Sequence, residues 1–215
     1  MRLAHKALAE HEPFVMPPAS KSFVGLFACA ILAACGGSSS QPPAEDAPLY
    51  GSAVTGGFDL VGPQGERVTD ADFAGQYQMV YFGYAYCPNV CPFDVQRMIQ
   101  GYNAFAEASP DLAADVQPIF ITVDPERDTP EVIAEFTQNF SDDLIGLTGT
   151  PEAIENSAEN FFVQYGKLPP NEGGGYLMDH SRVGYLVDRE GQPMAILPVT
   201  ESGDAVAAEL EKWVR

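Results

Sequence analysis

Hydrophobic residues after position 53 fall into short apolar runs separated by segments with helical spacing. Residues 79–84 and 116–123 are largely apolar and rich in β-branched and aromatic residues, which is typical of buried central strands. Between them, apolar residues recur every three or four positions over residues 93–106 and predict an amphipathic helix. Strands that alternate with helices in this way predict a partly parallel sheet with helices on both faces.

The rest of the domain follows the same alternation. Residues 128–131 and 150–152 each place a capping residue before a proline and predict helix starts, and the second helix is expected to reach about Tyr165. Turn residues between short strands predict an N-terminal hairpin over residues 57–68 and a second hairpin over residues 184–197. A short strand at residues 144–147 and a last helix at residues 202–214 complete an α/β fold with a central mixed sheet flanked by helices.

The N-terminal region, residues 1–35, is predicted to be a signal and not part of the fold. Residues 23–34 form an apolar run that is too short for a membrane span and follows Lys21, as in a secretory signal. The run ends in LAAC at residues 32–35, which resembles the lipobox of bacterial lipoproteins, so Cys35 is expected to be lipidated. An ordinary signal peptide or a short anchor helix is the alternative.

Two boundaries follow from this N-terminal region. Residues 1–15 contain acidic and histidine residues that do not suit the start of a signal, so Met16 is an alternative initiator. Residues 36–52 are rich in Gly, Ser, Pro and acidic residues and are expected to form a flexible tether. The folded domain is then expected to span residues 53–215.

The composition narrows the possible partners. The chain has 215 residues, of which 46% are hydrophobic, enough for one well-packed core. It has 11 basic and 30 acidic residues and a formal net charge of −19. A field of this sign argues against nucleic acid and against charge-driven binding to anionic lipid.

Cysteine and histidine are scarce in the predicted domain. Cys29 and Cys35 belong to the signal region, which leaves Cys87 and Cys91 as the domain's thiols and His180 as its one histidine. Each of the two cysteines precedes a proline, and proline disfavours helical backbone in the residue before it. Both are therefore expected in a loop, with a helix that starts near Pro92 and whose N-terminus lowers the thiol pKa.

Two thiolates and one imidazole form a donor set that suits copper. Soft sulfur selects Cu(I), and the same set takes Cu(II) with added oxygen ligands. Zinc stays open if Asp124 or Asp179 supplies a fourth ligand, and a plain stabilising disulfide between Cys87 and Cys91 is also open in an oxidising compartment. A lone histidine is a weak signal, but His180 follows three glycines that predict a mobile loop.

Three blocks of sequence together resemble the Sco/SenC family. Residues 82–92, FGYAYCPNVCP, resemble its C-P-x-x-C-P motif, residues 120–130 resemble its second block, and residues 176–181, with Asp-His-Ser at their end, resemble its third. Their order and spacing agree over about residues 55–214. Asn89 departs from the family, which often has Asp there; the change removes a negative charge and leaves the sulfur and nitrogen ligands intact.

The resemblance implies a thioredoxin-like fold with an inserted hairpin and copper ligation by Cys87, Cys91 and His180. Asp124 would lie close to the ligands, although a strand-end turn before Pro125 explains it equally well. The resemblance also implies a role in assembly of the CuA centre of cytochrome c oxidase, through copper delivery, through reduction of the target's cysteines, or both.

Two functions of different classes follow. One is a copper chaperone; the alternative is a membrane-anchored thiol–disulfide oxidoreductase in which Cys87 attacks, Cys91 resolves and His180 is not needed. A thiol peroxidase is disfavoured because no pattern singles out an activating arginine. The expected partners are the oxidase subunit that carries CuA and a periplasmic copper carrier or thiol reductant. The expected location is the bacterial cell membrane, lipid-anchored, with the domain facing the periplasm or the exterior.

Overall fold

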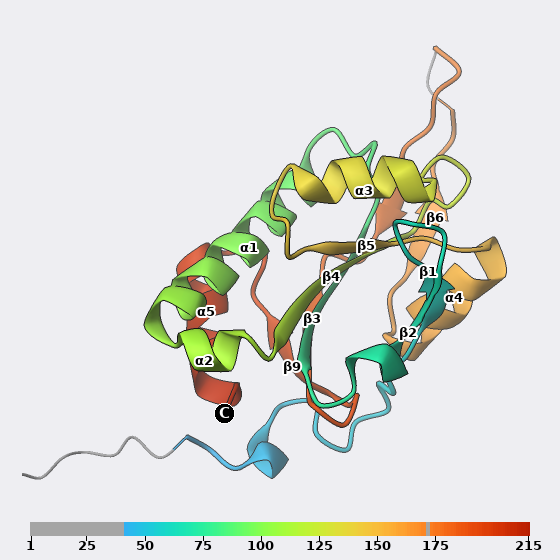
Figure 1. The fold of residues 1–215 in the computed structure, drawn as a ribbon. Helices are drawn as coiled ribbons and strands as arrows, with labels where there is room; N and C mark the ends of the chain where they lie inside the picture. Colours follow the sequence, from blue (N-terminus) through green and yellow to red (C-terminus); the bar gives the residue numbers. More distant parts are fainter. Residues whose placement is uncertain (1–40, 171–172) are drawn as a thin grey trace, which may run out of the picture. The chain divides into compact units, whose positions relative to one another are not determined.

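A computed structural model describes residues 41–170 and 173–215 (Figure 1). The strands are β1 (Asp59–Val61), β2 (Arg67–Thr69), β3 (Tyr77–Gly83), β4 (Val116–Thr122), β5 (Ile145–Leu147), β6 (Tyr165–Lys167), β7 (Met178–His180), β8 (Gly184–Val187) and β9 (Pro193–Leu197). The helices are α1 (Val90–Ala108), α2 (Pro110–Ala113), α3 (Pro130–Gln138), α4 (Pro151–Asn160) and α5 (Gly203–Trp213), with 3-10 turns η1 (Ala44–Asp46) and η2 (Asp70–Phe73).

Five strands form the central sheet in the order β5-β4-β3-β8-β9. β3 runs parallel to β4, with Tyr77 opposite Val116 and Gly83 opposite Thr122, and β4 runs parallel to β5. β8 is antiparallel to both β3 and β9, so the sheet is mixed, as predicted. β1–β2 and β6–β7 are two further antiparallel pairs outside this sheet.

Alternation along the central strands assigns α1, α3 and α5 to one face of the sheet. Tyr81 of β3 lies opposite Phe120 of β4, so their side chains share a face. The Tyr81 hydroxyl donates to Asp94 of α1, and the Phe120 ring lies 5.0 Å from Phe136 of α3. α5 packs along α1 and also contacts β9, which places it beside α1 on this face (Figure 1).

The other face of the sheet is covered by α4 and the residues that follow it. Phe82, the neighbour of Tyr81, points to this side, and its ring lies 5.4 Å from Phe161. Tyr185 of β8 also contacts Phe161, and its hydroxyl donates to the Phe161 carbonyl at 2.6 Å. The sheet is therefore buried between two layers, which explains why β3 is apolar without alternation.

Helix α1 begins at Val90, two residues before the position predicted from Pro92. The prediction was wrong for two reasons. Proline disfavours helical backbone in the residue before it but does not forbid it. Pro92 also lies in the first turn, where backbone N–H groups have no intrahelical acceptor, so the N–H that proline lacks is not needed there. Cys91 consequently lies inside the first turn of the helix and not in the preceding loop.

The segment after α4 also differs from the sequence-based expectation. α4 ends at Asn160 and not near Tyr165, and Phe162 has a positive φ of 54° that reverses the chain. Tyr165 then starts β6, which pairs with β7 so that Tyr165 lies opposite His180. This pair is the inserted hairpin that the family resemblance implied.

Residues 41–52, predicted as part of a tether, contact the domain. The Gln41 side chain donates to the carbonyls of Glu211 and Val214 at the end of α5, and the Leu49 N–H donates to Met194 at 2.9 Å. Ala47 is buried. The packed part of the chain therefore begins before residue 53, because Ala47 and Leu49 bring apolar surface into a segment whose composition is otherwise polar.

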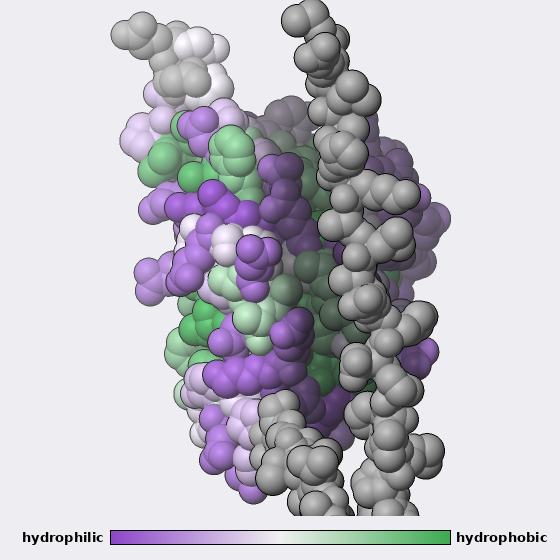
Figure 2. Space-filling view, turned by 90° about the vertical axis from the view of Figure 1, so that its left-hand side faces the viewer, coloured by the Kyte–Doolittle hydropathy of each residue, from purple (hydrophilic) through white to green (hydrophobic). Residues whose placement is uncertain are grey.

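Hydrophilic residues cover much of the face that lies at the left of Figure 1, with smaller hydrophobic patches between them (Figure 2). Within residues 41–170 and 173–215, none of the helices combines the length and the apolar character needed to cross a membrane. Residues 1–35, predicted to form the signal region, and Cys35 within them lie outside the described residues.

Candidate functional site

The two cysteines lie where β3 passes into α1. Cys87 is in the connecting loop with 7% of its surface exposed, and Cys91 is the second residue of α1 and fully buried. The backbone N–H of Cys91 donates to Cys87 Sγ at 3.4 Å, while the N-cap residue Asn89 makes no side-chain capping hydrogen bond. The sulfur therefore takes the place of a capping acceptor at the free N–H groups of the helix. Both cysteines are free thiols in this structure.

The two thiols have opposite pKa shifts. A hydrogen bond from the Cys91 side chain, followed by contacts from His180 and from the backbone N–H groups of Cys91 and Asn89, lowers the pKa of Cys87 below the usual thiol range. The same contact with Cys87, together with burial, raises the pKa of Cys91. The two shifts favour the thiolate form at Cys87 and the protonated thiol at Cys91.

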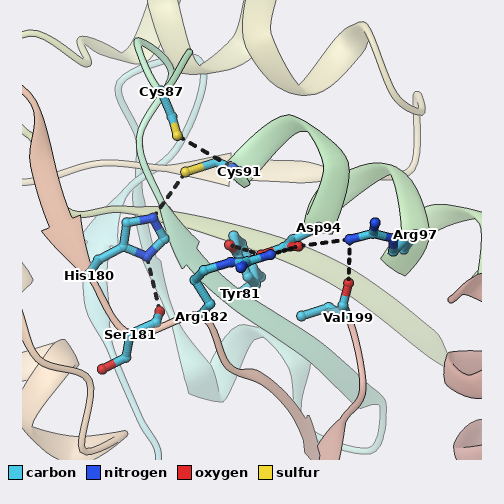
Figure 3. Close-up of polar contacts among 9 residues, drawn as sticks. All are labelled: Tyr81, Cys87, Cys91, Asp94, Arg97, His180, Ser181, Arg182 and Val199. Atoms are coloured by element: carbon cyan, nitrogen blue, oxygen red, sulfur yellow. Dashed lines mark hydrogen bonds and ion pairs between the residues drawn. The ribbon is translucent and has the colours of Figure 1, made fainter. Parts of the chain in front are cut away.

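His180 reaches this pair from the last position of β7. Its Nε2 lies 3.0 Å from Cys91 Sγ, and its Nδ1 lies 3.0 Å from the backbone carbonyl of Ser181 (Figure 3). A carbonyl accepts only, so Nδ1 carries a proton and donates it, which leaves the Nε2 lone pair directed at the sulfur when the ring is neutral. The rings of Tyr81 and Tyr84 meet the imidazole edge-on at 6.2 and 6.0 Å between centroids.

The loop that carries Cys87 is held by a buried carboxylate that the sequence analysis missed. Asp128, which is fully buried, accepts from the Ala85 N–H at 2.9 Å and from the Thr122 hydroxyl at 2.6 Å. Ala85 lies two residues before Cys87, and Thr122 is the last residue of β4. Asp128 thereby fixes the Cys loop to the end of the neighbouring strand, while burial raises the pKa of its carboxyl group.

Asp124 lies at the end of β4 and contacts the segment before β7. It is buried, and its carboxylate accepts from the Tyr176 hydroxyl at 2.8 Å and from the Arg127 side chain. Arg127 also donates to the Tyr176 carbonyl at 2.9 Å and stacks on the Tyr176 ring at 3.7 Å. Both oxygens of Asp124 are engaged in this cluster, so the residue ties the hairpin to the sheet. Met178 belongs to the hydrophobic core.

The donor types in this cluster fit copper, but the side chains are not closed around a metal position. Among the described residues, no group of three or more His, Cys, Asp or Glu side chains is arranged to hold a metal ion as it stands. The hydrogen-bond contact between His180 Nε2 and Cys91 Sγ leaves no room for an ion between those atoms. Two sulfurs and one imidazole nitrogen are nevertheless the soft and borderline donors that copper prefers.

Residues 46–215 match the family model described as SCO1/SenC. The human mitochondrial protein SCO1 homolog is 36% identical over 166 residues, which cover 77% of this chain and 54% of that protein. The chain thus spans about half the length of the curated relatives it matches first.

Two solved structures are similar over most of the described fold. The crystal structure of Arabidopsis thaliana ScoI with copper bound is 35% identical, has a TM-score of 0.70, and is matched over 75% of this chain and 98% of that chain. The structure of Bradyrhizobium japonicum ScoI with copper bound is 33% identical, has a TM-score of 0.67, and is matched over 75% and 100%. The thioredoxin-like fold predicted from the sequence is confirmed by this similarity, and the chain belongs to the SCO1/SenC family.

Proposed function

We propose that this chain is a copper chaperone that binds copper through Cys87, Cys91 and His180 and serves assembly of the CuA centre of cytochrome c oxidase. The observation that carries the proposal is the 3.0 Å approach of His180 Nε2 to Cys91 Sγ. These residues are 89 positions apart and come from different elements. An imidazole beside a thiol pair adds a nitrogen ligand that suits copper, whereas disulfide exchange does not need it.

The protonation states suit capture of Cu(I). The lowered pKa of Cys87 favours a thiolate that binds the ion without first losing a proton, whereas the raised pKa of Cys91 favours a thiol that releases its proton as the second sulfur ligates. His180 offers the Nε2 lone pair because its Nδ1–H is held by Ser181. Transfer to a partner proceeds by ligand exchange, in which the partner's thiolates replace the two sulfurs one at a time.

A titration with Cu(I) tests the proposal. The reduced chain is titrated anaerobically against a competing chelator, alongside Cys87→Ser and His180→Ala variants whose folding is checked by circular dichroism. We expect one tightly held Cu(I) per chain, lost in Cys87→Ser and weakened in His180→Ala. Weak or non-stoichiometric copper, with His180→Ala indistinguishable from the parent, would refute the chaperone.

The second candidate is a thiol–disulfide oxidoreductase, favoured by the unequal pKa values of the two cysteines. The Cys87 thiolate would attack a partner disulfide, release one partner thiolate and form a mixed disulfide. Cys91 would then lose its proton and attack Cys87 Sγ, so that the partner leaves fully reduced and a Cys87–Cys91 disulfide forms. Reduction of a CuA-site disulfide by His180→Ala at the parental rate, without copper, would favour this function.

Partners and location are part of the same proposal. The proposed partner is the oxidase subunit that carries CuA, with a periplasmic copper carrier or thiol reductant upstream. We propose that Cys35 bears a lipid that anchors the chain to a bacterial cell membrane, with the domain facing the periplasm or the exterior; the lipobox-like residues 32–35 support this. Mass spectrometry of the mature N-terminus would test it, since a free or absent Cys35 would contradict the anchor.

A further inference from the structure

A buried carboxylate one helical turn beyond Cys91 has no part in the ligand set described above. Asp94 of α1 is 0% exposed, yet it accepts four hydrogen bonds (Figure 3). Arg182 donates through Nε at 2.8 Å and Nη2 at 2.7 Å, the Tyr81 hydroxyl donates at 3.0 Å, and Arg97 donates at 3.2 Å. The carboxylate is buried while both arginines are partly exposed, and removing a partner leaves a buried charge less well compensated, which is costly.

The ion pair between Asp94 and Arg182 joins the two segments that carry the proposed ligands. Asp94 lies three residues after Cys91 on α1, and Arg182 lies two residues after His180 in the connection from β7 to β8. The same two segments therefore meet twice, once through the bidentate ion pair and once through the contact of His180 Nε2 with Cys91 Sγ.

Hydrogen bonds of the sheet do not supply this connection. Among the strands of residues 41–170 and 173–215, β7 pairs with β6 and with no strand of the central sheet. The position of His180 relative to α1 therefore depends on side-chain contacts together with the short chain connection from β7 to β8. Tyr81 of β3 adds to the same fixation, because its hydroxyl donates to Asp94 while its ring packs edge-on against the imidazole.

We propose that Asp94 and Arg182 are positioning residues that hold the His180 imidazole at the cysteine pair. This inference rests on the proposed copper function and concerns the oxidation state that the site retains. The two thiolates supply most of the affinity for Cu(I), which the imidazole raises further, whereas Cu(II) depends more strongly on nitrogen and oxygen donors. A looser imidazole therefore weakens Cu(II) binding more than Cu(I) binding, and outer partners of metal ligands typically change affinity by about 10–100-fold.

The chain offers a matched pair of variants. Arg182→Gln removes the arginine that bridges to the His180 segment and leaves Asp94 paired with Tyr81 and Arg97. Arg97→Gln removes the same charge and one hydrogen bond from the same carboxylate, but Arg97 is on α1 itself, three residues from Asp94. Its other contact is the Val199 carbonyl at 3.5 Å, away from the hairpin. A role of these arginines through their charge alone would make the two variants behave alike.

Two readouts decide the inference. Competition titrations with Cu(I) and Cu(II) are expected to give a loss in Cu(II) affinity of about tenfold or more in Arg182→Gln, with Cu(I) affinity within about threefold, and no comparable loss in Arg97→Gln. The imidazole ¹⁵N signals of the copper-free protein are expected to report one tautomer in the parent and in Arg97→Gln, and a mixture in Arg182→Gln. Arg182→Lys, which keeps the charge and one donor, should restore part of both properties.

The outcomes separate this inference from the proposed function. If the parent binds one copper and Arg182→Gln keeps both affinities and a single tautomer, the positioning role is overturned and the chaperone stands. Equal losses in Arg182→Gln and Arg97→Gln also overturn it. If the parent binds no copper, the proposed function fails, and the tautomer readout alone then decides whether the ion pair holds His180. Should Arg182→Gln not fold, the same comparison is made with Arg182→Lys.

Discussion

The pKa of Cys87 gives a quantitative test of the site's electrostatics. The Cys91 side chain is the largest cause of the lowered pKa of Cys87, and the N–H groups of Cys91 and Asn89 and the His180 side chain add to it. A hydrogen bond to a charged group contributes about 1.5–3 kcal/mol, and a change of one pH unit in pKa corresponds to about 1.4 kcal/mol. Cys91→Ala is therefore expected to raise the pKa of Cys87 by about one to two pH units, and to leave it below the ordinary thiol value because the other donors remain.

Alkylation with iodoacetamide as a function of pH measures this change. Because the thiolate reacts and the pKa of Cys87 is lowered, the parent should keep its reactivity as the pH falls from 8 and lose it only below the lowered pKa. Peptide mass mapping separates Cys87 from Cys91, and Cys87→Ala serves as the control for Cys91. The reasoning is refuted if Cys87 of the parent titrates near 8.5, the ordinary value, or if Cys91→Ala leaves the profile unchanged.

Two further predictions concern stability and are checked by urea denaturation. A Cβ at Gly101 would lie 2.5 Å from Val206 Cβ and 2.7 Å from the Gly203 carbonyl oxygen. Gly101→Ala should therefore lower the stability, because the overpacking cost of about 1–3 kcal/mol exceeds the gain of about 1 kcal/mol in helix propensity. An unchanged or higher stability would contradict this. Asp128→Ala leaves the Ala85 N–H and the Thr122 hydroxyl unpaired and should lower the free energy of unfolding by about 2–4 kcal/mol. Asp128→Asn keeps an acceptor oxygen and should lower it less. Equal losses in the two variants would show that the charge of Asp128, and not its hydrogen bonds, stabilises the fold.

Periodicity and residue scarcity made much of this molecule predictable. β3 and β4 are largely apolar without alternation because both faces of the sheet are covered, and that pattern is visible in the sequence itself. Cys87, Cys91 and His180 are singled out because the predicted domain holds no other cysteine or histidine. The structure places His180 beside Cys91, although the sequence separates them by 89 positions.

The features that sequence analysis missed depend on contacts between distant segments. Tyr165 was assigned to the end of a helix because its strand partner, His180, lies beyond a long loop, and pairing over such a distance has no local signature. Asp94 and Asp128 are two among 30 acidic residues, and their sequence neighbours do not reveal that they are buried. What distinguishes Asp94 is Arg182, which is 88 positions away.

The contacts of residues 41–52 have a consequence for the direction from which a partner can reach the sulfurs. Gln41 is bound to the end of α5, and the Arg215 carbonyl near that end accepts from the Tyr77 hydroxyl at 3.5 Å. Tyr77 starts β3, whereas the Cys87 loop follows its last residue, about 20 Å further along a strand of seven residues. Residue 41 thus lies near the start of β3, whereas the two thiols lie beyond the end of β3. Copper bound at the proposed site would therefore be handed over at the end of β3 opposite the one near which residues 41–52 contact the fold.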